Sequence, residues 1–209
     1  MSTNENDLKP TRQSRGEETR RAILRAAEGV FADLGFDGAR MDDVAERVGI
    51  RRASLVYYFR DKQCLYEALL DDLFGDLSGR YAATLVGAGT PTERMLQCID
   101  VWAKQVEERP GMLRISLWEI ARATAFKPVP LAARVRPIVE LIADAVRAGQ
   151  RAGIFRDVDP VGFVMSVAGT TSFLALRTAL LSPEVAPEPP RGRLAEELRD
   201  WVKRFLFVD

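Results

Sequence analysis

The side chains best suited to catalytic or metal chemistry are scarce in this sequence. It contains no histidine, which is the commonest general base and metal ligand at neutral pH. Its two cysteines, Cys64 and Cys98, stand among apolar residues, far from the close pairing of a zinc or redox motif. No G-x-S-x-G, phosphate-loop or paired-carboxylate motif occurs. We therefore expect no catalytic residue, no metal and no cofactor, and two cysteines that serve as packing residues.

A different chemistry is available between residues 40 and 62, where arginine, tyrosine, serine and lysine side chains gather. An arginine can grip a phosphate or form two parallel hydrogen bonds to a guanine edge. Residues 9–62 carry 12 basic and 9 acidic side chains, whereas residues 63–209 carry 18 and 19. The basic excess of the first part is small, so it supports a contact with nucleic acid only together with a suitable motif.

Helices must position these side chains, since no strand-like alternation occurs around them. Residues 1–16 are polar and include Pro10 and Gly16, which predicts a flexible N-terminal arm. From residue 17 apolar residues recur at helical spacing as far as Leu34, and Gly35 offers a left-handed end to that helix. Two short helices are predicted over residues 41–48 and 52–59, separated by Gly49 and Ile50.

The segment MDDVAERVGIRRASLVYYF has the features of a helix-turn-helix over about residues 41–59. Ala45 is small where a second helix would cross, and Gly49 can take the positive φ of a sharp turn. The residues expected to share a core are Val44, Val48, Ile50, Leu55 and Tyr58. An ordinary helical hairpin with a glycine turn is the alternative, but the agreement of so many positions favours the helix-turn-helix.

Residues 17–77 also resemble the DNA-binding domain of the tetracycline-repressor (TetR) family. The resemblance is carried by the FADLGF stretch at residues 31–36, Asp43-Val44-Ala45, Gly49-Ile50, Leu55, Tyr58-Phe59, and Lys62 leading into Leu65. It implies an all-α protein in which a three-helix DNA-binding domain, residues 17–62, is joined to a helical ligand-binding and dimerisation domain, residues 63–209. It covers about the first third of the chain, so it does not transfer a particular ligand.

The resemblance implies that the third helix enters the major groove of DNA. On that geometry Arg52 and Tyr57 are the candidates for base edges, Ser54, Tyr58 and Lys62 are the candidates for phosphate oxygens, and Arg40 and Arg51 could contact either. The family usually has small hydroxyl residues at positions 40 and 51, so this sequence departs from it in being more basic, and sequence preference could differ accordingly. The alternative for each arginine is a solvated helix face, and Tyr58 could instead belong mainly to the core.

The remainder of the chain is expected to be a helical sensor domain. Helical spacing predicts helices over Leu65 to Leu77, after Pro91, over 111–124 and from Val135 to Val146. The helix after Pro91 begins with a Thr90–Glu93 capping pair. A last helix carries Leu194, Leu198, Trp201 and Phe205 on one stripe. Phe74, Trp102 and Trp118 are named as candidates for lining a cavity that binds a small apolar ligand. Plain core packing is the alternative for each of them.

The segment VGFVMSVAGTTSFLAL, residues 161–176, is apolar on all sides. Its 16 residues fall short of the roughly 20 that a membrane-spanning helix needs. We expect this helix and the last one to form the interface of a homodimer.

Together these features predict a sequence-specific DNA-binding transcriptional regulator. It would act as a repressor released from a palindromic operator by a small ligand. The first residues lack the apolar run of a secretory signal, which predicts a cytoplasmic protein without a membrane partner. A helical interaction scaffold and a carboxylate-dependent helical enzyme are the alternatives, and salt-dependent DNA binding would separate them from a regulator.

Overall fold

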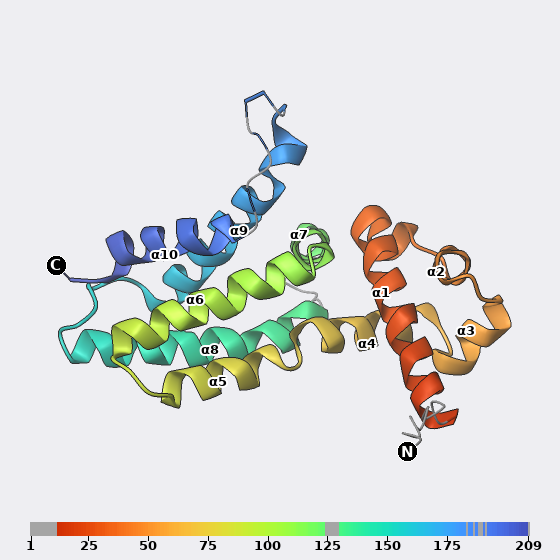
Figure 1. Cartoon of the computed structure of the whole chain (residues 1–209), viewed down its shortest axis with the longest axis horizontal. Coiled ribbons are helices and arrows are strands. Elements are labelled where there is room, and N and C mark those ends of the chain that lie inside the picture. Colours follow the sequence, from red (N-terminus) through yellow and green to blue (C-terminus); the bar gives the residue numbers. More distant parts are fainter. Residues whose placement is uncertain are drawn as a thin grey trace, which may run out of the picture. The chain divides into compact units, whose positions relative to one another are not determined.

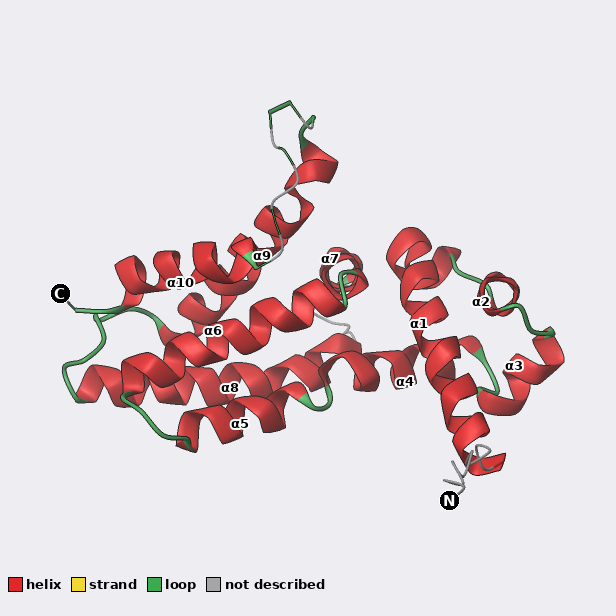
Figure 2. Cartoon of the chain, viewed as in Figure 1, coloured by secondary structure: helices red, strands yellow, loops and turns green. Residues whose placement is uncertain are grey.

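The fold is helical, as the sequence predicts. A computed structural model of the chain describes residues 12–123, 130–182, 184–185, 187, 190 and 192–208. Helices follow one another along the chain (Figures 1 and 2), and within these residues the extended backbone pairing is an isolated bridge between Phe155 and Phe207. No described helix is both long and apolar enough to cross a bilayer.

The chain divides into two compact units, Met1–Leu69 and Leu70–Asp209. Helix α4, Lys62–Phe74, contributes residues to both, and the boundary falls seven residues after the one expected at Lys62. The boundary is later because the first two turns of α4 bury Leu65, Tyr66 and Leu69 in the core of the first unit.

The first unit consists of α1, Arg12–Gly38, α2, Met41–Val48, α3, Arg52–Tyr58, and the start of α4. Helix α1 begins at Arg12, so the expectation of a flexible arm is wrong for residues 12–16, and the rest of that arm, residues 1–11, lies outside the described residues. The helix is interrupted at Gly35, where φ is 66° and ψ is 175°, because glycine takes this conformation without the clash of a β-carbon.

The second unit contains α5, Leu77–Val86, α6, Pro91–Glu108, α7, Gly111–Arg122, α8, Pro130–Arg151, α9, Pro160–Leu180, and α10, Arg193–Leu206. Helix α6 packs against α5 and α10, and α8 packs against α5 and α9. The predicted capping pair is present at the start of α6, where Thr90 Oγ1 accepts from the Glu93 amide at 3.2 Å and Glu93 Oε2 accepts from the Thr90 amide at 2.7 Å. These caps satisfy amides that have no partner inside the helix.

Helix α10 presents a different face to the core from the one expected. Its fully buried residues are Leu198, Val202 and Leu206, whereas Trp201 is half-buried and Phe205 is exposed. Trp201 and Phe205 stack on each other, with ring centroids 4.7 Å apart, beside Phe163 of α9. The aromatic residues of the predicted stripe therefore lie at the edge of the core rather than inside it.

Candidate DNA-binding surface and ligand cavity

The turn between α2 and α3 is built by Ala45 and Gly49. Gly49 adopts the left-handed conformation, with φ 78° and ψ 31°, and its amide donates to the carbonyl groups of Ala45 and Glu46. The amide of Ile50 also donates to the Ala45 carbonyl at 3.0 Å, which satisfies the last carbonyls of α2. Val44, Ala45 and Leu55 are buried, so the two helices share a core as the sequence predicts. This arrangement is a helix-turn-helix.

The outer face of α3 is polar and open to solvent. Arg51, Arg52, Ser54 and Tyr57 are exposed, and the Tyr57 side chain protrudes with 84% of its surface accessible. Tyr58 is half-buried, with its ring edge-on to that of Tyr57 at 5.3 Å. Tyr58 therefore contributes to the edge of the core and to the outer face at once.

Acidic residues of α2 contact two of the candidate arginines, Arg52 through its side chain and Arg40 through its backbone. The Arg52 guanidinium pairs with Asp42 at 2.6 Å, although both side chains remain largely exposed. Arg40 precedes α2, and its backbone amide donates to Asp43 Oδ2 at 2.8 Å, which leaves its exposed side chain outside this contact. Exposed ion pairs contribute little to stability, so Arg52 can exchange Asp42 for another anion at small cost.

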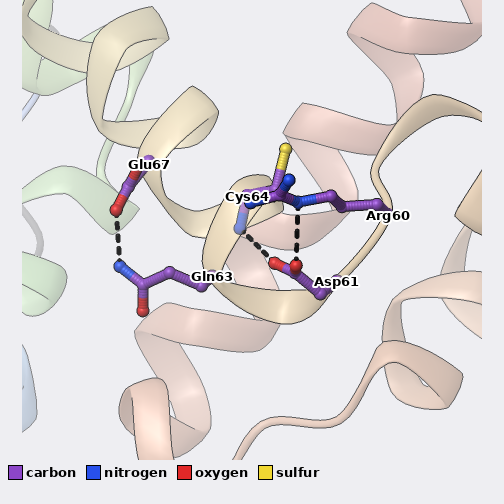
Figure 3. Close-up of polar contacts among 5 residues, drawn as sticks. All are labelled: Arg60, Asp61, Gln63, Cys64 and Glu67. Atoms are coloured by element: carbon purple, nitrogen blue, oxygen red, sulfur yellow. Dashed lines mark hydrogen bonds and ion pairs between the residues drawn. The ribbon is translucent and has the colours of Figure 1, made fainter.

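The loop from α3 to α4 is held by Asp61. Its Oδ1 accepts from the amide of Cys64 at 2.7 Å, which makes Asp61 the N-cap of α4, and its Oδ2 accepts from Arg60 Nε at 3.0 Å (Figure 3). Arg60 is an exposed cation next to the end of α3 that the sequence reasoning did not single out. Its position directly after the aromatic pair Tyr58-Phe59 is the signal that could have identified it.

The Lys62 ammonium forms its hydrogen bonds with backbone carbonyls of the protein itself. Its ammonium donates to the carbonyl oxygens of Phe36 at 2.7 Å, Ala39 at 3.0 Å and Asp37 at 3.4 Å, and lies 4.6 Å from the centre of the Phe36 ring. An ammonium has three N–H donors, and these contacts occupy all three directions. The geometry thus argues against the expected phosphate contact and gives Lys62 the task of tying α4 to the end of α1.

The second unit contains an apolar cavity of about 90 Å³ that is partly open to solvent. Phe74 and Trp102, two of the three residues expected there, line it together with residues of α5, α6, α8 and α9. Trp118 is not among the lining residues, because it lies on α7 with 44% of its surface exposed. Helical spacing identified Trp118 as apolar but could not show which neighbours would surround it.

The polar groups of the cavity wall are few. Trp102 Nε1 donates to Thr171 Oγ1 at 2.9 Å, and the Thr171 hydroxyl donates in turn to the carbonyl of Val167 at 2.6 Å. Burial raises the pKa of the Cys98 thiol to about 12, and burial likewise raises the pKa of the Tyr81 phenol. Both groups are therefore uncharged at neutral pH. Sequence reasoning missed Tyr81, although it follows Leu77 at helical spacing.

These features define a helix-turn-helix DNA-binding protein with a separate helical unit around a cavity, and in the described part of the chain no cluster of side chains suits a metal ion. Residues 23–69 match the family described as bacterial regulatory proteins, tetR family, and residues 91–199 match the tetracyclin repressor-like C-terminal domain. The chain belongs to the TetR family of DNA-binding transcriptional regulators, which are not enzymes.

Known proteins agree with this assignment. The chain is 25% identical over 171 residues to the transcriptional repressor KstR2 of Mycolicibacterium smegmatis, covering 81% of this chain and 83% of KstR2. Its fold is similar to that of the ketosteroid regulator KstR2 of Mycobacterium tuberculosis, with a TM-score of 0.70 and 20% identity over 91% of this chain and 95% of that one. The fatty acid degradation regulator FadR of Bacillus halodurans gives a TM-score of 0.68 at 14% identity, covering 88% and 94%.

Proposed function

We propose that this regulator is a repressor that reads its operator with α3 and is released by a small apolar ligand bound in the cavity of the second unit. The assignment of α3 as the operator-reading helix rests on its outer face. Arg51, Arg52 and Tyr57 project into solvent there, from a helix held in place by the helix-turn-helix. Arg52 and Tyr57 read base edges. Ser54, Tyr58, Arg40, Arg51 and the neighbouring Arg60 contact the backbone.

DNA selection from a random duplex pool, followed by binding titrations of the selected site, tests this assignment. The variant Arg52→Ala is expected to weaken binding to the selected site by about 1–3 kcal/mol and to relax preference at one base position. It should change binding to unselected duplex much less. The matched control is Arg136→Ala, which removes an exposed arginine of α8 that also has an acidic partner. Equal losses in both variants, or no selected site at all, would reject the placement of α3.

The cavity supports the second half of the proposal. None of its lining residues is charged, and aliphatic and aromatic side chains make up nearly all of the wall. Burying an ionised group there would require a compensating partner that the wall does not offer. The effector is therefore an uncharged, mainly apolar compound.

Helix α4 is the connection through which the ligand acts. Lys62 fixes its first turn to carbonyls of the first unit. At its other end the Leu73 carbonyl accepts from Gln105 of α6 at 2.9 Å, and Asp71 pairs with Arg134 of α8 at 2.9 Å. Helices α6 and α8 also line the cavity. A ligand that binds one arrangement of these helices more tightly than another therefore shifts the position of α4. The free energy of that shift comes only from the difference between the ligand's affinities for the two arrangements.

We also propose that the protein acts as a homodimer through α9 and α10. Phe163, Val167 and Thr171 of α9 are buried within the unit, whereas Val161, Met165 and Phe173 are exposed, Phe173 by 71%. An apolar surface of this kind on a helix with no charge before Arg177 is typical of an interface between subunits. A twofold dimer would read a palindromic operator with half-sites about one helical turn apart.

A further inference from the structure

The cavity offers a ligand one polar spot, and Tyr81 is its main component. Tyr81 lies on α5 among the lining residues and is only 5% exposed. Cys98 of α6 is another lining residue, and Tyr81 is the lining residue that carries a hydroxyl group. Apart from these two groups and the indole N–H of Trp102, the lining side chains are hydrocarbon or thioether.

Within the described residues the Tyr81 hydroxyl forms no hydrogen bond, and its interactions with Cys98 and Arg80 are electrostatic only. The adjacent Arg80 directs its guanidinium to Gln105 Oε1 at 2.9 Å instead, and the Thr84 hydroxyl, one turn along α5, donates to the carbonyl of Arg80. A buried phenol usually finds a hydrogen-bond partner, since leaving the group unsatisfied costs its desolvation free energy. A group left open at a cavity wall is suited to a partner that the ligand brings.

The other polar groups of the wall do not compete for that role. Trp102 is already paired with Thr171, whose own hydroxyl proton is used by Val167. Cys98 holds its proton at neutral pH, which makes it a weak hydrogen-bond donor and a poor nucleophile. Recognition of the ligand by reversible hydrogen bonding to Tyr81 is therefore favoured over covalent capture by Cys98.

The size of the cavity limits the ligand further. Its volume is about 90 Å³, whereas an engineered apolar cavity of about 150 Å³ binds benzene. A one-ring compound would thus need some movement of the wall, which the unbranched side chains of Met95 and Met165 can provide. Larger ring systems would require the helices themselves to separate.

We propose that the cavity selects an uncharged compound of about one ring whose single hydroxyl or carbonyl oxygen hydrogen-bonds to Tyr81. This inference rests on the proposed ligand-sensing function and names the chemical class of the effector. Tyr81 is the residue that determines specificity, and the remaining wall supplies apolar contact.

Calorimetric titration of the free protein with toluene, p-cresol and p-toluate tests the inference. These probes share one ring and differ in having no polar group, one hydroxyl or one carboxylate. The parent protein should bind p-cresol about three- to tenfold more tightly than toluene, as expected for one hydrogen bond. It should bind p-toluate at least about a hundredfold more weakly than p-cresol, because its charge would be buried without a partner.

The variant Tyr81→Phe should bind p-cresol and toluene equally, with its affinity for toluene unchanged. Tyr66→Phe, which removes the hydroxyl of a buried tyrosine in the first unit, is the matched control and should keep the preference for p-cresol. The preference measured in the parent protein tests the inference even where a variant folds poorly. Equal affinities in the parent, a preference that survives Tyr81→Phe, tight binding of p-toluate, or no binding of any probe would each overturn it.

Failure of this inference is distinguishable from failure of the proposed function. Binding of toluene without a preference for p-cresol would overturn the role of Tyr81 and leave an apolar ligand site in place. Loss of the selected DNA site would instead reject the assignment of α3, and the titrations described above contain no DNA.

Discussion

At the scale of single residues, Lys62 shows how a cation at a plausible DNA-contacting position can be used inside the protein. Its ammonium holds the carbonyls of Phe36, Asp37 and Ala39, just after the break in α1 at Gly35. Carbonyl groups beyond a helix end need donors, and a charged donor forms the stronger hydrogen bonds. The first unit depends on this lysine to hold α1 against α4.

We predict that Lys62→Met destabilises the first unit by about 1.5–3 kcal/mol, the contribution typical of hydrogen bonds to a charged group. Amide hydrogen exchange in peptides covering residues 36–50 should become correspondingly faster. The control is Lys104→Met, since Lys104 is exposed and forms only an i,i+4 pair with Glu108. Unchanged exchange together with a uniform loss of DNA affinity would restore Lys62 as a phosphate contact.

Cys98 gives a second prediction at this scale. Because burial raises its pKa to about 12, iodoacetamide at pH 8 should modify Cys98 at least about a hundredfold more slowly than a free thiol. Cys64 of the first unit is less buried and serves as the internal reference. The unfolded chain loses this proton near the ordinary value of 9.0, whereas the folded protein keeps it. Stability of the second unit should therefore fall as pH rises above 9. Rapid labelling of Cys98 at pH 8 would contradict this.

At the scale of elements, Gly49 carries the turn of the helix-turn-helix. Its φ is 78°, and a β-carbon added there would meet no atom within 4 Å, so the cost of a substitution comes from the backbone alone. We predict that Gly49→Val destabilises the first unit by about 1–2 kcal/mol or more, and that Gly49→Asn costs less because asparagine tolerates this conformation. Urea unfolding followed by circular dichroism measures both.

The matched control for the turn is Gly16→Ala in α1. A β-carbon at Gly16 also meets nothing within 4 Å, but its backbone is helical, so alanine should be neutral or stabilising by up to about 1 kcal/mol. If Gly49→Val behaved like Gly16→Ala, the left-handed turn would not be what fixes α3.

The elements themselves were largely predictable, because their signals are local. Helix α2 runs over the expected residues, and α3 ends one residue before the predicted Phe59, which lies buried at its C-cap. What the sequence could not show is which neighbours cover a helix. Trp118 and Phe205 have the same helical spacing as core residues, yet both side chains are exposed. Which residues line the cavity depends on tertiary packing. Helical spacing alone named Phe74 and Trp102, which line it, and missed Tyr81, which also lines it.

At the scale of the whole molecule, the proposed homodimer depends on the exposed face of α9. Gly169 is exposed on this helix with no atom within 4 Å of an added β-carbon, so the monomer accommodates a larger side chain. We predict that Gly169→Glu raises the dimer dissociation constant at least about a hundredfold, because it buries an unpaired carboxylate in the interface. Sedimentation velocity at micromolar concentration measures this.

Ala83→Glu, at an exposed position of α5, is the control for the dimer and should leave it intact. A monomeric parent protein would reject the homodimer, and a fully dimeric Gly169→Glu variant would place the interface elsewhere. The homodimer expected from the sequence stays a prediction, since an all-round apolar helix is compatible with burial inside one subunit as well as between two.

The division into two compact units has a spectroscopic consequence. The three tryptophans, Trp102, Trp118 and Trp201, all belong to the second unit, whereas Tyr57, Tyr58 and Tyr66, three of the four tyrosines, belong to the first. Tryptophan emission therefore reports on the second unit alone, and tyrosine signals report mainly on the first unit. If the two units unfold at different denaturant concentrations, the two signals will give separate midpoints, and a ligand bound in the cavity will shift the tryptophan midpoint first.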